Sequence, residues 1–141
     1  MRVSVKRVGA HALPLPAYES AGAVACDLRS NRDVIIKGGE TVRIGCGFAF
    51  EIPPGHWAQV RSRSSSLGRG HRIEPGTIDS DYRGEVQIQL TNCTTEHIGV
   101  LEGDRIAQLV IAPVVRASLV EVAELSETAR GEGGFGSSGV R

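Results

Sequence analysis

The sequence has no net charge and no long apolar stretch. Its 16 lysines and arginines equal its 16 aspartates and glutamates, so no overall field draws a polyanion to the surface, which argues against non-specific binding of nucleic acid. The longest apolar candidate, Ile106 to Val115, is interrupted by Gln108 and Pro113 and falls short of the ~20 residues of a membrane helix. We therefore expect no direct contact with nucleic acid and no membrane segment, although a local group of arginines can still hold a small phosphorylated ligand.

Cysteine is also scarce. The three cysteines, Cys26, Cys46 and Cys93, are odd in number and show no metal-ligand spacing, and the N-terminus does not read as a charged stretch followed by an apolar signal core. Free thiols are typical of a reducing compartment. The sequence predicts a cytoplasmic protein whose 141 residues form one domain around a single core.

Glycine and proline, by contrast, are spread through the whole chain, where 18 glycines and 6 prolines punctuate short runs rich in valine and isoleucine. That pattern is typical of an all-β domain. A short helix near Ser64 to Arg69 is compatible with the sequence. The expected strands are Arg2 to Val8, Asp33 to Ile36, Thr41 to Ile44, Gly47 to Ile52, Trp57 to Val60, Glu85 to Thr91, Ile106 to Ala112 and Ser118 to Val122.

The segment Glu85 to Thr91 has the clearest strand pattern. Its apolar residues Val86, Ile88 and Leu90 alternate with polar ones, as expected of a strand with one buried face. Gln87 and Gln89 are therefore predicted to share the other face.

The composition changes after Val122, because residues 124–141 are rich in glycine and poor in apolar side chains. We predict a β core over residues 1–123 and a flexible arm over residues 124–141. On composition alone the arm is either a disordered tail or a lid, since glycine lets peptide N–H groups approach phosphates closely. Phe135 is its one aromatic residue.

Two loops concentrate residues that can do chemistry. The segment Gly76 to Gly84 places Asp79, Asp81 and Tyr82 directly before the best strand, and its alternative interpretation is a polar β-turn. The segment Arg61 to Gly68 combines arginines with serines, which donate to phosphate oxygens, but a solvated loop has the same composition.

Taken together, five segments in order resemble the motifs of the trimeric dUTPase family. They are Ala21 to Leu28, Arg61 to Gly68, Gly76 to Gly84, Gly103 to Gln108 and Arg130 to Gly139. The second departs from the family pattern by an extra residue, so we take Arg63 as its arginine and leave the following serine open between Ser64, Ser65 and Ser66. The stretch before Ile78 is shorter than usual.

The resemblance implies hydrolysis of dUTP to dUMP and pyrophosphate by water attack on the α-phosphorus. Asp79 is implied as the general base, Gln108 as the residue that holds the water, and Tyr82 as the ring that packs on deoxyribose. Competing with Asp79 is Asp81, two residues on. The uracil ring is expected to meet main-chain groups of a hairpin over Gly70 to Ile78, including Gly76.

The resemblance also implies a Mg²⁺ ion held mainly by the substrate phosphates, with Asp27 reaching it through water. The alternative for Asp27 is a turn residue at a strand end. From the arm, Arg130 is implied to meet the γ-phosphate and Phe135 to stack on the base, with phosphate contacts from Gly136, Ser137 and Ser138.

The fold implied by the resemblance is a jelly-roll-like β domain that forms a homotrimer with sites at subunit boundaries. Two alternatives remain. A dCTP deaminase or bifunctional deaminase of the same superfamily needs a glutamate where this chain has Gln89, and an amide cannot cycle a proton. A dUTP-sensing regulatory protein would use the site without turnover.

Overall fold

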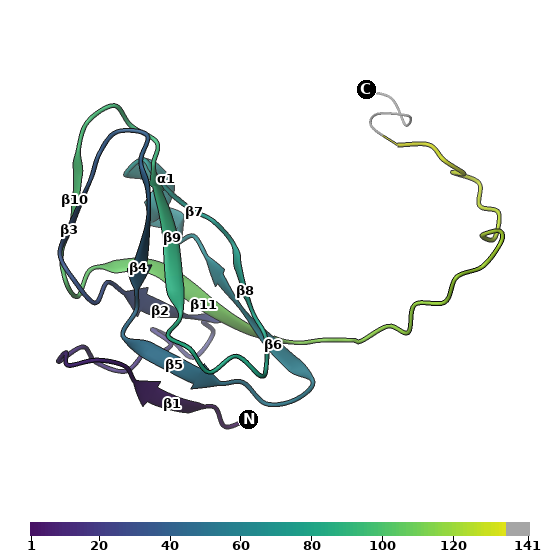
Figure 1. The fold of residues 1–141 in the computed structure, drawn as a ribbon, viewed down its shortest axis with the longest axis horizontal. Helices are drawn as coiled ribbons and strands as arrows, with labels where there is room; N and C mark the ends of the chain where they lie inside the picture. Colours follow the sequence, from purple (N-terminus) through teal and green to yellow (C-terminus); the bar gives the residue numbers. More distant parts are fainter. Residues whose placement is uncertain (135–141) are drawn as a thin grey trace.

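The computed structural model describes residues 1–134, apart from the side chain of Leu67, and within them the regular elements are strands except for one short helix (Figure 1). In chain order the elements are β1 (Ser4–Arg7), β2 (Ala25–Arg29), β3 (Val34–Ile36), β4 (Thr41–Gly45), β5 (Phe48–Glu51), β6 (His56–Arg61), α1 (Ser64–Gly68), β7 (His71–Ile73), β8 (Gly76–Ile78), β9 (Gln87–Asn92), β10 (Ile98–Val100) and β11 (Arg105–Pro113). In the described part of the chain, no helix has the length and apolar character needed to cross a membrane.

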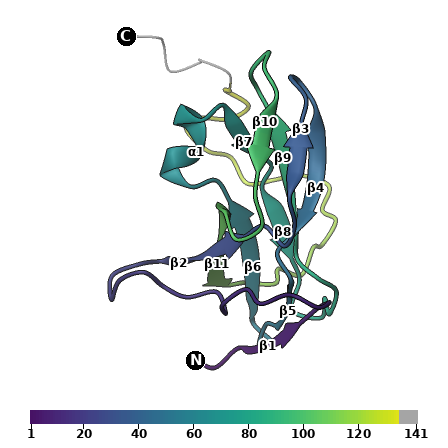
Figure 2. The same ribbon diagram turned by 90° about the vertical axis from the view of Figure 1, so that its left-hand side faces the viewer.

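Two larger antiparallel sheets contribute to one core. The first has the strand order β2-β11-β6-β8 and the second has the order β4-β9-β7. Leu28 and Leu109 from the first sheet join Ile88 and Leu90 from the second in a single buried cluster. The pairs β1-β5 and β3-β10 lie at the edges of this body (Figure 2). The predicted all-β, jelly-roll-like sandwich is confirmed.

The strand β9 has the alternation that its sequence predicts. Ile88 and Leu90 are fully buried, as is Val86 just before the strand, whereas Gln87 is exposed and Gln89 is half-buried. The two glutamines therefore share the outer face, as expected.

The structure adds strands that the sequence patterns did not reveal and confirms the short helix near Ser64. The unpredicted strands are β2, β7, β8 and β10. The last three have three residues each, too few for an alternating pattern to be recognised, whereas β2 does alternate, with Cys26 and Leu28 buried.

The predicted strand Ser118 to Val122 is wrong. After β11 the chain has no strand or helix up to residue 134, and it leads away from the body (Figure 1). Leu119 is 95% exposed and Val120 is 74% exposed. A strand needs a neighbour that accepts and donates its peptide hydrogen bonds, and within this chain the segment has none beside it.

The three cysteines are unpaired, as predicted. Cys26 and Cys46 lie in the core and Cys93 is exposed. Burial raises the pKa of the Cys46 thiol to about 12 and raises that of Cys26 as well, so both thiols are protonated and unreactive near neutral pH.

Candidate functional site

An aspartate clamped by two arginines lies on the first sheet. The carboxylate of Asp27 in β2 accepts hydrogen bonds from Arg63 on both oxygens, from Nε to Oδ1 at 2.8 Å and from Nη2 to Oδ2 at 3.3 Å. Arg105 Nη1 donates to Oδ2 at 3.2 Å. The Asp27 side chain is 13% exposed, so two cationic groups converge on one nearly buried acid.

Sheet register brings three of the sequence motifs to this place. On β11, Gln108 lies opposite Asp27 of β2 on one side and opposite Arg61 of β6 on the other. Gln108 Nε2 donates to the carbonyl oxygen of Ser62 at 2.8 Å, which fixes the chain as it leaves β6 for α1. The first, second and fourth motifs, far apart in the sequence, are therefore neighbours in one sheet.

The serines of the second motif differ in exposure. Ser64 and Ser65 are exposed on α1, whereas Ser66 is buried at 4% exposure. Arg63 Nη1 donates to Ser65 Oγ at 3.4 Å and to the carbonyl oxygen of Arg105 at 3.2 Å. Of the three serines left open by the sequence, Ser64 and Ser65 are the two that solvent reaches.

The third motif lines a separate hollow, which we call the base slot. It measures about 260 Å³ and is lined by Gly76, Thr77, Ile78, Asp79, Tyr82 and Gln87. Asp79 is exposed at its margin, and the Tyr82 hydroxyl donates to the carbonyl oxygen of Glu85 at 3.0 Å. A side chain at Gly84 would collide with the Tyr82 ring. The turn therefore holds the aromatic ring in one position beside the carboxylate.

The slot exists because the chain changes sheets between β7 and β8. The expected hairpin over Gly70 to Ile78 is wrong: β7 pairs with β9 in the second sheet, whereas β8 pairs with β6 at the edge of the first. β7 pairs with Leu90 to Asn92 of β9, so the start of β9 at Gln87 is not part of this pairing. Peptide groups of β8 therefore face a gap toward Gln87, not a neighbouring strand.

The two acids of the third motif lie in different surroundings. Asp79 lines the base slot, whereas Asp81 lines a hollow of about 430 Å³ with Arg2, Glu51 and Arg83 among its other residues. Only the first of these two hollows contains Tyr82. The structure thus separates two carboxylates that the sequence could not rank.

The base slot and the clamped aspartate are far apart within one chain. Gln108 of β11 lies opposite Arg61, at the end of β6. Asp79 follows Ile78 of β8, which lies opposite Ala58, near the start of β6, so the two residues are displaced along the strands as well as across them. At ~3.3 Å per residue and ~4.8 Å between strands, about 16 Å separates the Asp79 and Gln108 backbones, and about 19 Å separates Asp79 from Asp27. One chain presents two half-sites.

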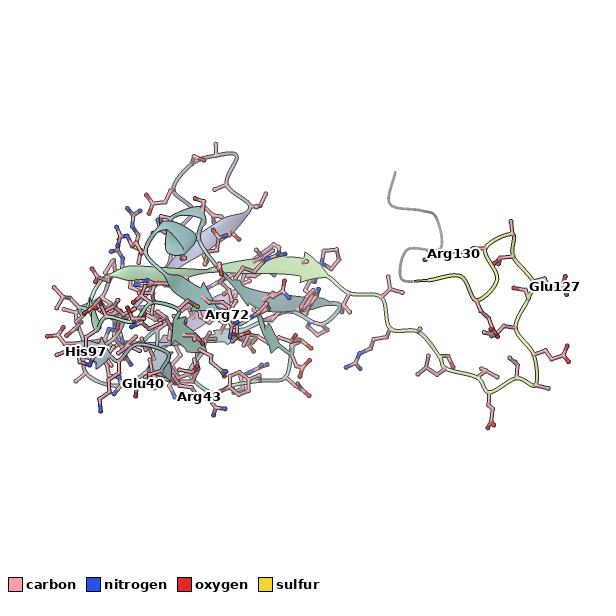
Figure 3. All side chains as sticks on the ribbon, turned by 90° about the horizontal axis from the view of Figure 1, so that it is seen from above. Glu40, Arg43, Arg72, His97, Glu127 and Arg130 are labelled. Atoms are coloured by element: carbon pink, nitrogen blue, oxygen red, sulfur yellow. The ribbon has the colours of Figure 1, made fainter. Side chains whose placement is uncertain are left out.

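The described residues of the arm, 124–134, contribute nothing to either half-site. Arg130 and Glu127 lie on the extended segment, away from the body that carries Arg43 and Arg72 (Figure 3). Arg130 Nε donates to the carbonyl oxygen of Gly133 at 2.6 Å. The predicted contact residues Phe135, Gly136, Ser137 and Ser138 lie outside the described residues.

Sequence reasoning missed three residues of these half-sites. Arg105 stands inside the fourth motif, but its ion pair with Asp27 depends on the pairing of β2 with β11. Gln87 was placed on the outer face of its strand without a role, and no sequence signal linked Glu85 to Tyr82. Within residues 1–134, no group of three histidine, cysteine, aspartate or glutamate side chains is arranged to hold a metal ion.

Arginines and hydroxyls at one half-site, and a carboxylate beside a slot of about 260 Å³ at the other, are the groups expected of a protein of the nucleotide-binding class. The family model "dUTPase" matches residues 11–139. The chain belongs to the dUTPase family.

Relatives and solved structures agree with this membership. The chain is 50% identical to the deoxyuridine 5'-triphosphate nucleotidohydrolase of Nautilia profundicola, with 99% of each chain covered, and 51% identical to that of Anaeromyxobacter sp., with 97% of each covered. Its fold is similar to a variant dUTPase of Staphylococcus bacteriophage 80alpha with dUpNHpp, at a TM-score of 0.91, 28% identity and 99% coverage of each chain. A mutant dUTPase of phage phi11, at a TM-score of 0.84, 23% identity and 90% coverage of this chain and 100% of the other, is described with a structural Mg(II) ion.

Proposed function

We propose that this protein hydrolyses dUTP to dUMP and pyrophosphate, which limits uracil incorporation into DNA and supplies dUMP for thymidylate synthesis. The observation that carries the proposal is the base slot, where the exposed Asp79 carboxylate stands at the margin of a hollow that also contains Tyr82. This is the arrangement needed to hold a nucleoside with its α-phosphate beside a general base. Membership of the dUTPase family supports the same substrate.

Each residue at the reacting centre has one task. Asp79 accepts the proton of the attacking water, and Gln108 of a neighbouring subunit orients that water. The Tyr82 ring, fixed by its hydroxyl on Glu85, leaves no room for a 2′-hydroxyl. Edge peptide groups of β8 from Gly76 to Ile78 bind the base, because unpaired main-chain groups offer both donors and acceptors.

Phosphate contacts come from the clamped half-site. Arg63 and the exposed Ser64 and Ser65 donate to phosphate oxygens, whereas the buried Ser66 supports the helix that presents them. Asp27 fixes the Arg63 guanidinium through two hydrogen bonds. From the arm, Arg130, Phe135, Gly136, Ser137 and Ser138 close over the triphosphate and the base.

A Mg²⁺ ion held mainly by the substrate phosphates fits this half-site. Asp27 holds the phosphate-contacting Arg63, and both its oxygens are already engaged by Arg63 and Arg105. A carboxylate so occupied suits contact with the hydration shell of the ion better than direct coordination. When bound, Mg²⁺ neutralises the charge that develops on the phosphate oxygens.

We further propose a homotrimer in which each site joins half-sites of two chains. The separation of about 16 Å between the Asp79 and Gln108 backbones supports this, because both residues must reach one water by hydrogen bonds of ~3 Å. The exposed apolar side chains after β11, including Val115 and Leu119, support burial against another copy. In this trimer the core of each chain comprises residues 1–123, and its arm, residues 124–141, covers a site formed by the other two chains.

Free thiols support the cytoplasm as the compartment.

The test is incubation of the purified protein with dUTP, dCTP and UTP in the presence of Mg²⁺, with the products identified. We expect dUMP and pyrophosphate from dUTP, and little turnover of the other two. Release of ammonia or formation of deoxyuridine nucleotides from dCTP would favour the deaminase alternative. Tight binding of dUTP without any product would favour a sensor.

A further inference from the structure

A carboxylate from the loop before β2 meets the clamped half-site at its solvent side. Glu19 Oε1 lies 3.4 Å from Arg105 Nη1, and the same nitrogen donates to Asp27 Oδ2 at 3.2 Å. The Glu19 and Arg105 side chains are 60% and 40% exposed, whereas that of Asp27 is 13% exposed. Arg105 therefore has one partner that is held within the half-site and one that faces solvent.

Glu19 belongs to a loop that is attached to the body mainly at its two ends. The connection into β2 projects from the body (Figure 2), and Pro14, Leu15 and residues 17–22 are exposed. The buried Leu13 fixes its start, and β2 begins directly after it. In the described part of the chain, the ion pair with Arg105 is the only polar contact that joins residues 14–24 to the strands. The carboxylate can thus leave Arg105 without disturbing the core.

Beside Glu19 lies a hollow of about 150 Å³ that reaches the clamped half-site. Glu19, Asp27 and Arg29 are among its lining residues. Arg29, whose Nη1 donates to a main-chain carbonyl oxygen at 2.7 Å, brings a third guanidinium group to the region of Arg63 and Arg105. Glu19 therefore reduces an excess of positive charge in the region where substrate phosphates are proposed to bind.

We propose that Glu19 is an internal competitor of the substrate phosphates, which pairs with Arg105 before substrate binds and is displaced when a phosphate oxygen takes its place. The proposal rests on the proposed function. An exposed ion pair is weak, so a polyphosphate with several charges displaces Glu19, whereas the nearly buried pairing with Asp27 persists and keeps the guanidinium in place. Glu19 then lowers the affinity for the phosphate chain of substrate and product alike, which favours release of pyrophosphate.

The experiment measures the binding of inorganic tripolyphosphate by calorimetry in the presence of EDTA, so that no metal ion joins the carboxylate to the phosphates. Glu19→Gln keeps the size of the side chain but removes its charge. We expect the dissociation constant to fall by about two- to fivefold, the scale of an exposed ion pair. A structural role for Glu19 predicts weaker binding instead. In the Arg105→Ala background the same change should have no effect, because the competitor acts through Arg105.

Glu102 supplies a matched control. It is exposed, as Glu19 is, and lies three residues before Arg105, but none of the ion pairs in the described part of the chain includes it. Glu102→Gln removes the same charge from the same region. At physiological ionic strength, where the Debye length is ~8 Å, this variant should keep the wild-type dissociation constant.

The outcomes are separable. Unchanged or weaker binding in Glu19→Gln overturns the proposal, as does an equal gain in Glu102→Gln, which would reflect net charge alone. A gain that persists in the Arg105→Ala background overturns the part of Arg105; should that variant not fold, Arg105→Gln serves the same comparison.

Hydrolysis of dUTP is measured separately on the wild-type protein. If that protein binds tripolyphosphate but does not hydrolyse dUTP, the proposed function fails, and the dissociation constants still decide whether Glu19 competes. If it hydrolyses dUTP but does not bind tripolyphosphate, the proposed function stands and the competitor is overturned.

Discussion

Two inactive variants of this protein should restore each other's activity when they assemble together. In Asp79→Asn the base slot half-site is defective, and in Gln108→Ala the clamped half-site is defective. The two positions lie about 16 Å apart within one chain, at ~3.3 Å per residue and ~4.8 Å between strands, so in the proposed homotrimer each working site draws them from different chains. A mixed trimer therefore contains one site in which both halves are intact.

The expected recovery follows from the geometry of a ring. In a closed three-fold ring, the base slot of each chain meets the clamped half-site of the next chain, always in the same direction around the ring. Every mixed trimer therefore has about one intact site in three, whichever variant is in excess. Each variant alone should retain ~1% or less of wild-type activity, the scale for losing a general base or its water ligand. Trimers that carry both variants should thus show about a third of the wild-type kcat, a gain of ~30-fold.

The assay is co-expression of the two variants with different affinity tags, purification on both tags, and measurement of pyrophosphate release from dUTP. The matched control is the pair Gln108→Ala and Arg63→Ala, whose defects lie in the same half-site. That pair should show no recovery, because each clamped half-site comes from a single chain. Failure of the first pair to recover, with both variants present in the purified trimers, would refute the division of the site between chains.

Three further predictions concern single residues and the arm. Asp79→Asn should lower kcat for dUTP by at least ~10²-fold while dUTP still binds, and Asp81→Asn should lower it far less; near wild-type turnover in the first variant contradicts the role of Asp79. Truncation after Ala129 should leave the melting temperature nearly unchanged but remove most hydrolysis, and full activity would exclude a closing arm. Tyr82→Ala should raise turnover of UTP relative to dUTP and leave dCTP excluded; admission of dCTP alone would assign the ring to the base.

The sequence was sufficient for the fold class because alternation and turn residues are local signals. The pattern of β9 predicted which of its side chains are buried, and that of Ser64 to Arg69 allowed the short helix. A three-residue strand such as β8 has no room for such a pattern, and its existence depends on β6 lying beside it. The mistaken strand at Ser118 to Val122 has the opposite cause, since its β-branched and apolar residues suit a strand but meet no partner in this chain.

The candidate site was predicted in part for the same reason. Motif residues such as Asp79 and Arg63 could be named because their order along the chain resembles a family. Their distribution over two half-sites could not be, because it depends on sheet register, which relates residues without regard to sequence distance. The sequence placed Gln87 on the outer face of β9. Only the separation of β7 and β8 into two different sheets shows that Gln87 borders a hollow.

The gap between β8 and β9 also bears on how the protein can change over evolutionary time. Its walls from Gly76 to Ile78 include peptide groups, which every amino acid except proline supplies alike. Substitutions at the outward-facing Thr77 therefore leave the donors and acceptors of that wall in place, provided that the course of the chain from one sheet to the other is preserved. A binding surface of this kind tolerates extensive drift in sequence, and its constraint falls instead on the length of the Glu74-Pro75 connection that steers the chain between the sheets.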